Sequence, residues 1–285
     1  YKLLIMKVGI IGYGFVGRAL KSGLNSSEEV CLIDPILKTT ESDLIKFDPQ
    51  IVFVCVPTPM NDDGSQNISI LTNVLLNLIA FNINCPVVLK STTLPSALNK
   101  ITSYMPEIVY NPEFLREKHA EEDFIKSNHI VLGGSNKNSI SFVEQFYLNN
   151  TKCIAKNYVK TDLITASMIK YTINSFLATK VSFFNEINTV FKSSDANDTW
   201  NNFIEYLSYD KRLGDSHMSV PGHDGRLGFG GACLPKDSKA FIKYAESKNI
   251  ELNVLNTAIR VNNNIRQRYD INKRESDQNI KFNDV

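Results

Sequence analysis

One cysteine in this chain lies among residue types that suit covalent chemistry. Residues 228–237 read GFGGACLPKD, so Cys233 follows three glycines and precedes Lys236 and Asp237. The thiolate is the nucleophilic form of cysteine, and a nearby lysine or helix N-terminus favours it. Glycines let the backbone approach a bulky ligand, and Asp237 is suited to hold a water or to orient Lys236. The motif predicts that Cys233 is a nucleophile rather than a core residue.

A glycine-rich turn near the start predicts a dinucleotide site. The apolar run 7–11 is typical of a strand, and it leads into Gly12-Tyr13-Gly14-Phe15-Val16-Gly17 at the start of an expected helix, residues 15–24. Glycines here permit a tight turn and close approach of a pyrophosphate to the helix N-terminus. Asp34 ends the second expected strand, where a carboxylate accepts hydrogen bonds from a ribose 2′-hydroxyl and repels a 2′-phosphate. The sequence therefore predicts NAD rather than NADP as the cofactor.

The first half alternates short apolar runs with helical patterns, which is typical of an α/β fold with a doubly wound, mostly parallel sheet. Expected strands are residues 7–11, 30–33, 51–56, 86–90, 107–110 and 129–132, with helical patterns at 15–24 and 68–80. Loops after the third and fourth strands carry Pro57, Thr58, Ser91 and Thr92, whose hydroxyls and nearby amides suit contact with a cofactor or a water. The loop after the fifth strand carries Glu113 and Glu117, which could share a helical face or lie in a structured loop.

The second half is expected to be helical, beginning with a long helix over residues 159–191. Such a helix suits a connection between domains and a dimer surface. Lys170 and Asn174 lie one turn apart on it, and beside a cysteine nucleophile they are candidates to bind an oxyanion or move a proton. Further helices are expected at 200–207, 236–249 and 252–268, and the polar tail 272–285 is expected to fray. The predicted domains are a Rossmann dinucleotide-binding domain, residues 1–157, and the connecting helix with an all-α central domain, residues 158–285.

The composition argues against several classes of protein. The formal net charge of +1 over 285 residues gives no electrostatic reason to expect nucleic acid or an anionic membrane. No apolar run reaches the roughly 18 residues that a spanning helix needs. Five scattered cysteines without a signal sequence favour reduced thiols in the cytoplasm. His217 and His223 lie in no zinc-ligand pattern, so no metal site is expected.

Six motifs together resemble the UDP-glucose/GDP-mannose dehydrogenase family, and most closely its UDP-glucose 6-dehydrogenases. In chain order they are GYGFVG, KSTTLP, NPEFLRE, Lys170-x-x-x-Asn174, Arg212-Leu213-Gly214 and GFGGACLPKD, and the resemblance runs from about Met6 to about Asn264. It implies a four-electron oxidation of a nucleotide-sugar CH₂OH to a carboxylate with two NAD⁺, as in UDP-glucose to UDP-glucuronate. It also implies a place in nucleotide-sugar metabolism and polysaccharide biosynthesis.

The resemblance further implies a role for each candidate site residue. Cys233 would add to the C6 aldehyde as a thiohemiacetal, and a second hydride transfer would give a thioester that water hydrolyses. Lys170 and Asn174 would stabilise the oxyanion, Thr92 and Asp237 would hold a water, and Glu117 would serve thioester hydrolysis. The implied cofactor-binding residues are Gly12, Tyr13, Gly14, Phe15, Val16, Gly17, Asp34, Pro57, Thr58, Ser91, Thr92 and Lys236. The implied substrate-binding residues are Glu113, Phe114, Leu115, Arg116, Lys170, Asn174, Arg212 and Gly230. Arg212 would reach a substrate in the neighbouring subunit, which implies a homodimer through the long helix.

The chain departs from the family pattern in length. Family members continue with a second Rossmann-like, UDP-binding domain, whereas this sequence ends soon after the expected central helices, and residues 215–226 lengthen the loop before the cysteine motif. GDP-mannose or a UDP-N-acetylhexosamine remains an alternative substrate. A β-hydroxyacid dehydrogenase is another alternative, but its reaction needs no cysteine, so Cys233 within its motif argues against it. A non-catalytic module that binds NAD or a nucleotide sugar is a further alternative, but the presence of Cys233, Lys170 and Asp237 favours an enzyme.

Overall fold

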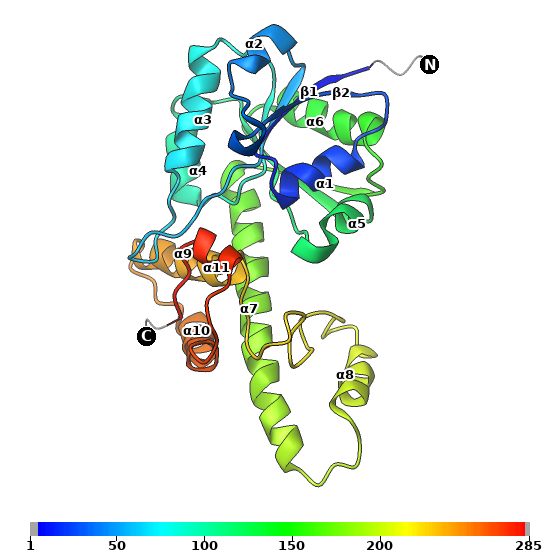
Figure 1. Ribbon diagram of the computed structural model, residues 1–285, viewed down its shortest axis with the longest axis vertical. Helices are drawn as coiled ribbons and strands as arrows, with labels where there is room; N and C mark the ends of the chain where they lie inside the picture. Colours follow the sequence, from blue (N-terminus) through cyan, green and yellow to red (C-terminus); the bar gives the residue numbers. More distant parts are fainter. Residues whose placement is uncertain (1–4, 283–285) are drawn as a thin grey trace. The chain divides into compact units, whose positions relative to one another are not determined.

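The structure is a computed structural model that describes residues 5–282 of the chain (Figure 1). The chain divides into two compact units. Unit 1 comprises residues 1–58 and 67–170, and unit 2 comprises residues 59–66 and 171–285. The domain boundary after residue 157 stays a prediction. Within residues 5–282, no helix combines the length and apolar character needed to cross a membrane.

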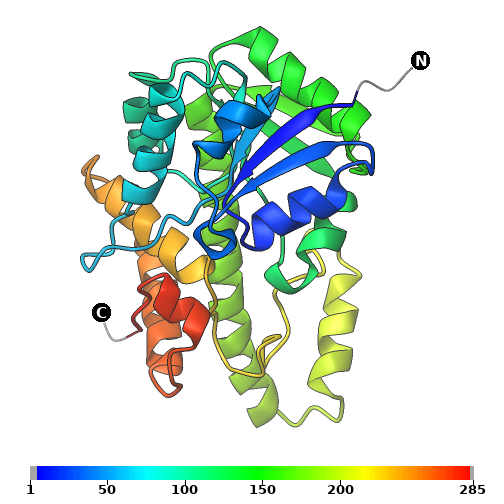
Figure 2. The same ribbon diagram turned by 45° about the horizontal axis from the view of Figure 1, so that its top comes forward.

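Unit 1 is built on a seven-stranded sheet with the order β2-β1-β3-β4-β5-β6-β7 (Figure 2). All neighbouring strands are parallel except β5 and β6, which pair antiparallel through Tyr110 and Gly133. This arrangement confirms the predicted α/β fold with a mostly parallel sheet. The strands are β1 Lys7–Ile11, β2 Glu29–Ile33, β3 Ile51–Val54, β4 Val87–Leu89, β5 Val109–Tyr110, β6 His129–Gly133 and β7 Asn157–Thr161.

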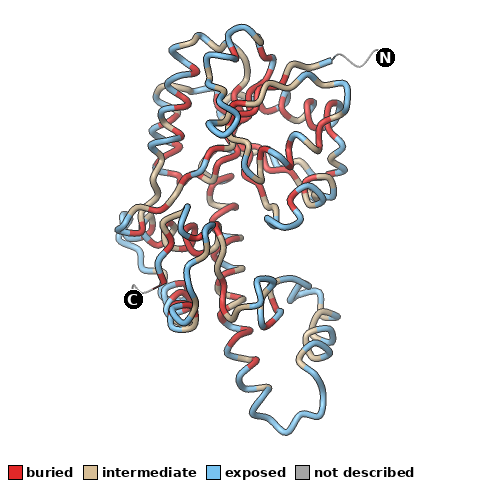
Figure 3. The backbone as a smooth tube through the Cα atoms, in the orientation of Figure 1, coloured by how far each residue is buried: buried red, intermediate tan, exposed pale blue. Residues whose placement is uncertain are grey.

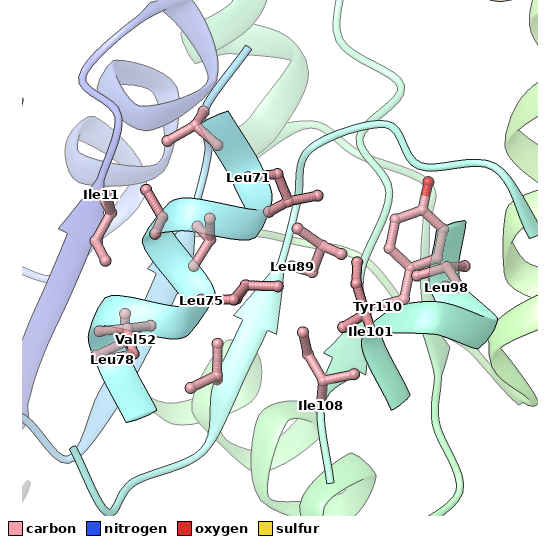
Figure 4. Packing of buried hydrophobic residues seen from close by; sticks show 14 of the residues in the cluster. Ile11, Val52, Leu71, Leu75, Leu78, Leu89, Leu98, Ile101, Ile108 and Tyr110 are labelled. Carbon is pink, nitrogen blue, oxygen red and sulfur yellow. The ribbon is translucent and has the colours of Figure 1, made fainter. Parts of the chain in front are cut away.

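Helices cover both faces of this sheet, so its strands are apolar on both sides. The helices of unit 1 are α1 Phe15–Gly23, α2 Asp43–Phe47, α3 Ser69–Ala80, α4 Pro95–Thr102, α5 Ala120–Ile125 and α6 Lys137–Asn150, with short 3₁₀ turns at Pro35–Leu37 and Glu117–His119. Successive strand residues point to opposite faces. Val52 accordingly packs with Leu75 of α3 and the other residues of one core, shown in Figure 4, whereas Phe53 packs with Phe146 of α6 in the other.

The long helix begins later than the sequence predicted. α7 spans Leu163–Ser193, and residues 157–161 form the edge strand β7 against β6 instead of its first turn. Asp162 marks the change, because its Oδ1 accepts a hydrogen bond from the backbone N–H of Thr165 at 2.9 Å. The expected start of the helix at residue 159 was therefore wrong. Because β7 is a half-exposed edge strand, Asn157 and Lys160 face solvent while their backbone pairs with β6.

Unit 2 is helical, as predicted. It contains α7 from Tyr171 onward, α8 Trp200–Ser208, α9 Leu234–Glu246, α10 Asn253–Arg266 and α11 Lys273–Asp277. Its core joins Ala178 of α7, Ile242 of α9 and Ile259 of α10 with Phe229 from the loop before α9. Figure 3 shows buried residues along α7 in this unit. This core places the loop that carries Cys233 on the apolar side of α9 and α10.

The tail of the chain is ordered up to residue 282, contrary to the predicted fraying. Asn272 and Glu275 form a reciprocal capping box at the start of α11, and the Glu275 side chain is fully buried. Ile280 and Phe282 beyond this helix are also buried. The tail further bonds to the segment 59–66, since Met60 N–H donates to the Gln278 carbonyl at 3.1 Å. Only residues 283–285 of the expected fraying tail lie outside the described residues.

Candidate functional site

The glycine fingerprint lies where the strand order reverses. β1 has β2 on one side and β3 on the other, and the crevice at such a switch point is where doubly wound sheets bind ligands. Gly12 adopts φ +91°, and a Cβ there would lie 2.6 Å from the Cys55 carbonyl oxygen. A Cβ on Gly17 would lie 2.1 Å from the Gly12 carbonyl oxygen. Gly12 and Gly17 therefore permit the close packing of the turn itself.

Gly14 differs from these two glycines, because a Cβ built on it meets nothing within 4 Å. It is the N-cap of α1 and places no side chain over the helix N-terminus, and the first turn carries no acidic residue. The positive end of the helix dipole therefore meets no negative side chain of the first turn, and it favours a bound anion. The residues present fit the pyrophosphate of a dinucleotide at this turn.

Asp34 holds the fingerprint turn through its carboxylate. Its Oδ2 accepts a hydrogen bond from Tyr13 N–H at 2.7 Å, and its Oδ1 accepts one from Ile36 N–H at 2.9 Å. An ionised carboxylate oxygen has lone pairs for more than one donor. Asp34 therefore keeps acceptor capacity for a ribose hydroxyl while it orders the backbone around Tyr13. Phe15 and Val16 of the fingerprint are half-buried at the start of α1.

The loops after β3 and β4 are tied to one another. Thr58 Oγ1 donates to the Thr92 carbonyl at 2.9 Å, and Ser91 Oγ donates to the Val56 carbonyl at 2.7 Å. Pro57, which precedes Thr58 in the first of these loops, is exposed, whereas Thr58 and Ser91 are buried. The structure thus brings these four predicted residues, Pro57, Thr58, Ser91 and Thr92, to one edge of the sheet.

Lys170 and Glu113 form a buried ion pair in unit 1. Lys170 Nζ lies 3.2 Å from Glu113 Oε1, with side chains 3% and 6% exposed, and it also donates to the Glu113 carbonyl oxygen at 2.6 Å. The ammonium lies 5.3 Å from the centre of the Phe114 ring. The other oxygen of Glu113 accepts a hydrogen bond from Leu115 N–H at 2.7 Å. Three of the predicted substrate-binding residues are therefore organised around the amine of a fourth.

Glu113 and Glu117 do not share a helical face. Glu113 is buried in a loop, whereas Glu117 is exposed at the start of a 3₁₀ turn, Glu117–His119. Arg116 between them is exposed and forms a two-pronged pair with Asp123, through Nε at 3.0 Å and Nη2 at 2.7 Å. Of the two arrangements that the sequence left open, the structured loop is the one observed.

Cys233 is the N-cap residue of α9, directly before a 13-residue helix. The backbone N–H of Asp237 donates to the Cys233 carbonyl at 2.9 Å. Asp237 is 1% exposed, and its two carboxylate oxygens accept hydrogen bonds from Asn174 Nδ2 at 2.6 Å and Lys236 Nζ at 2.5 Å. The structure therefore brings Asn174, Lys236, Asp237 and the cysteine turn together within unit 2.

Arg212 lies away from this cluster in the long loop before α9. Its side chain is 89% exposed and pairs with Asp210, with Nε to Oδ1 at 2.9 Å. Lys180 of α7 supports the segment, because its Nζ donates to the Leu213 carbonyl at 2.8 Å. Screening by solvent makes such an exposed pair weak, so Arg212 remains able to exchange Asp210 for another anionic partner.

The cysteines other than Cys233 are not disposed for thiolate chemistry. All five cysteines lie within residues 5–282, and none forms a disulfide. Burial raises the pKa of the Cys55 thiol to about 12, and burial also raises the pKa of Cys85 to about 12. Burial likewise raises the pKa of the Cys31 and Cys153 thiols. These four cysteines are therefore protonated near neutral pH.

Sequence reasoning missed the polar residues that hold the site loops from behind. In unit 1, Asn111 Oδ1 accepts hydrogen bonds from Lys90 Nζ at 2.9 Å and Tyr147 OH at 2.6 Å, all three buried. In unit 2, Asn262 Oδ1 accepts from Phe229 N–H at 2.6 Å, and Glu275 Oε1 accepts from Gly231 N–H at 3.0 Å. The available signal was asparagine on the apolar face of a predicted helix and the Asn272-x-x-Glu275 spacing of a capping box.

Two domain models of one family match most of the chain. Residues 37–151 match the NAD binding domain of the UDP-glucose/GDP-mannose dehydrogenase family, and residues 164–264 match its central domain. The chain belongs to this family. Its N-terminal half is accordingly an NAD-binding domain, which confirms the cofactor and the family resemblance predicted from the motifs.

Individual relatives agree with this assignment. The UDP-glucose 6-dehydrogenase of Rickettsia bellii is 36% identical over 221 residues, which are 75% of this chain and 49% of that protein. UDP-glucose 6-dehydrogenase YwqF of Bacillus subtilis is 29% identical over 91% of this chain and 66% of that protein. The solved UDP-glucose dehydrogenase of Pyrobaculum islandicum superposes with a TM-score of 0.74 at 25% identity, over 92% of this chain and 68% of that one. The chain spans about half the length of the curated relatives it matches, such as the Rickettsia bellii protein.

Proposed function

We propose that this protein oxidises the C6 hydroxymethyl of UDP-glucose to the carboxylate of UDP-glucuronate through a covalent intermediate on Cys233. NAD⁺, when bound at the fingerprint turn, would accept a hydride in each of two oxidation steps. The placement of Cys233 at the N-cap of α9, one turn before the buried Asp237, carries the proposal. A helix N-terminus favours the thiolate, which is the form that adds to an aldehyde.

Asp237 and Thr92 are proposed to hold the water that takes the proton of the C6 hydroxyl in the first oxidation. The contacts of Asp237 support this role, because hydrogen bonds from Asn174 and Lys236 hold its buried carboxylate in a fixed orientation. Thr92 lies in the loop tied to Thr58. General-base chemistry through a positioned water typically contributes about 10²-fold to 10⁴-fold.

Lys170 and Asn174 are proposed to stabilise the oxyanion of the thiohemiacetal. Both are buried side chains on α7 and both donate hydrogen bonds from positions fixed by a second residue, Glu113 for Lys170 and Asp237 for Asn174. Donors that are held in place before the reaction are worth roughly 3 kcal/mol each. Glu117, exposed at the start of its turn, would then assist water in hydrolysing the thioester.

The substrate is proposed to be a UDP-sugar bound through the NPEFLRE loop, with Glu113, Phe114, Leu115, Arg116, Arg212 and Gly230 as its contacts. The names of the relatives support UDP-glucose, since both curated relatives described above are UDP-glucose 6-dehydrogenases. GDP-mannose stays the alternative. We also propose that the reaction takes place in the cytoplasm and serves polysaccharide biosynthesis, consistent with five unbridged thiols.

We propose that the protein works as a homodimer through α7. Phe176, Phe183 and Val190 follow one another at intervals of seven residues and are 62%, 53% and 63% exposed. Residues seven apart lie on nearly the same face of a helix. An exposed apolar stripe of this kind is typical of an interaction surface.

The yield of NADH per sugar tests the reaction. The purified protein is incubated with limiting UDP-glucose and excess NAD⁺, and in parallel with limiting GDP-mannose. The proposal predicts two NADH and one UDP-glucuronate for each UDP-glucose. One NADH per sugar with accumulation of the aldehyde would exclude the thioester step. Full turnover of GDP-mannose alone would replace the proposed substrate.

A further inference from the structure

The glycine loop before Cys233 lacks regular secondary structure, so its backbone polar groups need partners elsewhere. Side chains provide them. Gly228 N–H donates to Asn185 Oδ1 at 3.0 Å, Phe229 N–H donates to Asn262 Oδ1 at 2.6 Å, and Gly231 N–H donates to Glu275 Oε1 at 3.0 Å. Three separate helices, α7, α10 and α11, thus hold a short run of backbone that ends two residues before Cys233.

Glu275 is the member of this set nearest to Cys233 along the loop. Its carboxylate is fully buried and accepts two backbone hydrogen bonds. Oε1 accepts one from Gly231 N–H, and Oε2 accepts one from Asn272 N–H at 3.0 Å. A charged acceptor makes a hydrogen bond roughly twice as strong as a neutral one. Because the carboxylate is buried, water does not compete with the loop for this hydrogen bond.

Arg266 faces the same stretch of backbone. Its Nη2 donates to the Gly228 carbonyl at 3.1 Å and pairs with Asp224 at 2.8 Å. A Cβ built on Gly230 would lie 2.4 Å from Glu275 Oε1 and 2.7 Å from Arg266 Cζ. The carboxylate and the guanidinium therefore both lie against the Gly230 backbone, and a side chain at residue 230 would displace them from these positions.

We propose that Glu275 is a positioning residue for Cys233: its carboxylate, with the Arg266 guanidinium, fixes the Gly230-Gly231 backbone so that the thiol is held at the N-terminus of α9. The inference rests on the proposed role of Cys233 as the nucleophile. It assigns a function to the polar tail, whose helix α11 presents the carboxylate to the loop. A shift of about 1 Å in a reacting group can cost 10²-fold in rate, so a single buried hydrogen bond at this point matters for turnover.

Four variants separate this contact from the general stability of the tail. Glu275→Ala removes both acceptor oxygens, and Glu275→Gln keeps one oxygen for Gly231 N–H while it removes the charge. Asn272→Ala deletes the other half of the capping box, the bond from Glu275 N–H to Asn272 Oδ1 at 3.0 Å, but leaves the carboxylate in place. Asp277→Ala changes an exposed carboxylate on the same helix and is the matched control.

Alkylation of Cys233 by iodoacetamide across a pH series, read by peptide mass spectrometry, is the decisive measurement because it needs neither NAD⁺ nor sugar. We expect Glu275→Ala to lower kcat about tenfold and to move the midpoint of the Cys233 profile upward, because the thiol would no longer be held at the N-terminus of α9. Glu275→Gln, which keeps a weaker acceptor for Gly231 N–H, should give a smaller shift in the same direction, with Asn272→Ala and Asp277→Ala close to the parent. A merely structural role would lower the Tm and leave the alkylation midpoint and the kcat of the folded protein unchanged, which would overturn the proposal.

Equal effects of Asn272→Ala and Glu275→Ala on the Cys233 profile would also overturn it, because they would trace the change to loss of α11. If the Glu275→Ala shift occurs but the parent itself yields no NADH from UDP-glucose, the positioning role stands and the proposed reaction fails. The two conclusions are therefore distinguishable.

Discussion

At the scale of single residues, the buried Lys170–Glu113 pair has both a structural and a proposed catalytic role. Each charge offsets the free energy lost when the other is removed from water. Both side chains are almost fully removed from solvent, and the ammonium of Lys170 lies 3.2 Å from the carboxylate of Glu113. Removing one partner of a buried pair leaves a charge that water cannot solvate. The pair thus keeps Lys170 in place at a site where its ammonium would otherwise be expensive to bury.

Lys170→Met should lower the free energy of unfolding by about 3 kcal/mol. The reason is the unpaired Glu113 carboxylate that the substitution leaves in the protein interior. Lys160→Met is the matched control, because it breaks a pair with Glu144 in which Lys160 is 48% exposed, and exposed pairs contribute about 1 kcal/mol or less. Urea denaturation measures both variants, and equal losses would contradict the account.

Gly14→Ala should separate cofactor binding from folding. A Cβ at this position meets nothing within 4 Å, so the free energy of unfolding should change by no more than about 1 kcal/mol. NAD affinity should fall, because the added methyl would meet a pyrophosphate at the N-terminus of α1. Gly17→Ala, with its collision against the Gly12 carbonyl, should instead destabilise the fold. Calorimetric titration with NAD⁺ and urea denaturation read the two effects, and unchanged NAD affinity in Gly14→Ala would remove that glycine from the site.

The raised pKa of Cys55 makes the free energy of unfolding depend on pH in the alkaline range. The unfolded thiol loses its proton near the ordinary pKa of 9.0, whereas burial keeps the folded thiol protonated up to about 12. Between these values the folded state binds more protons, so the free energy of unfolding falls as pH rises. Cys55→Ala should reduce the slope of this fall. Denaturation at a series of pH values from 9.0 upward checks it, and identical slopes for parent and variant would refute the burial argument.

At the scale of elements, α7 carries both buried side chains of the proposed site and the exposed apolar stripe of the proposed dimer surface. Its Asn174 and Asn185 side chains hold groups of unit 2, whereas Phe176, Phe183 and Val190 form the exposed stripe on the opposite face. One helix therefore serves the proposed site and the proposed dimer surface, so loss of dimerisation is expected to reduce activity as well.

Phe183→Asp should convert a dimer into a monomer. The carboxylate would be placed in the middle of the apolar stripe, where its desolvation in an interface is unfavourable. Leu148→Asp is the control, because Leu148 is a comparably exposed apolar residue, 52% exposed, on α6. Sedimentation velocity should show dimers for the parent and Leu148→Asp and monomers for Phe183→Asp. A monomeric parent would contradict the proposed surface.

The sequence predicted most elements because apolar periodicity dominates in the buried part of the sheet. All six expected strands are present, with ends shifted by a few residues. β7 was missed because an edge strand is half exposed, and its polar residues left a helical continuation equally plausible. The tail was misjudged because its order depends on one buried carboxylate, Glu275, and on the two apolar side chains Ile280 and Phe282.

At the scale of the whole molecule, the sequence located the candidate site residues by motif but not their partners. Spacing alone placed Lys170 and Asn174 on one helix and Cys233 next to Asp237. It could not show that Lys170 pairs with Glu113, because that contact joins residues 57 positions apart in the chain. Contacts of this length depend on how the elements pack, which local periodicity does not encode.

The proposed reaction depends most on Cys233 as the covalent nucleophile. The direct test is the formation of UDP-glucuronate from UDP-glucose by Cys233→Ser, measured beside NAD⁺ binding by the same preparation. We expect Cys233→Ser to bind NAD⁺ with the affinity of the parent and to form no acid, because a serine hydroxyl would not form the thioester that the second oxidation requires. Formation of the acid by Cys233→Ser at the parent rate would contradict the thioester mechanism.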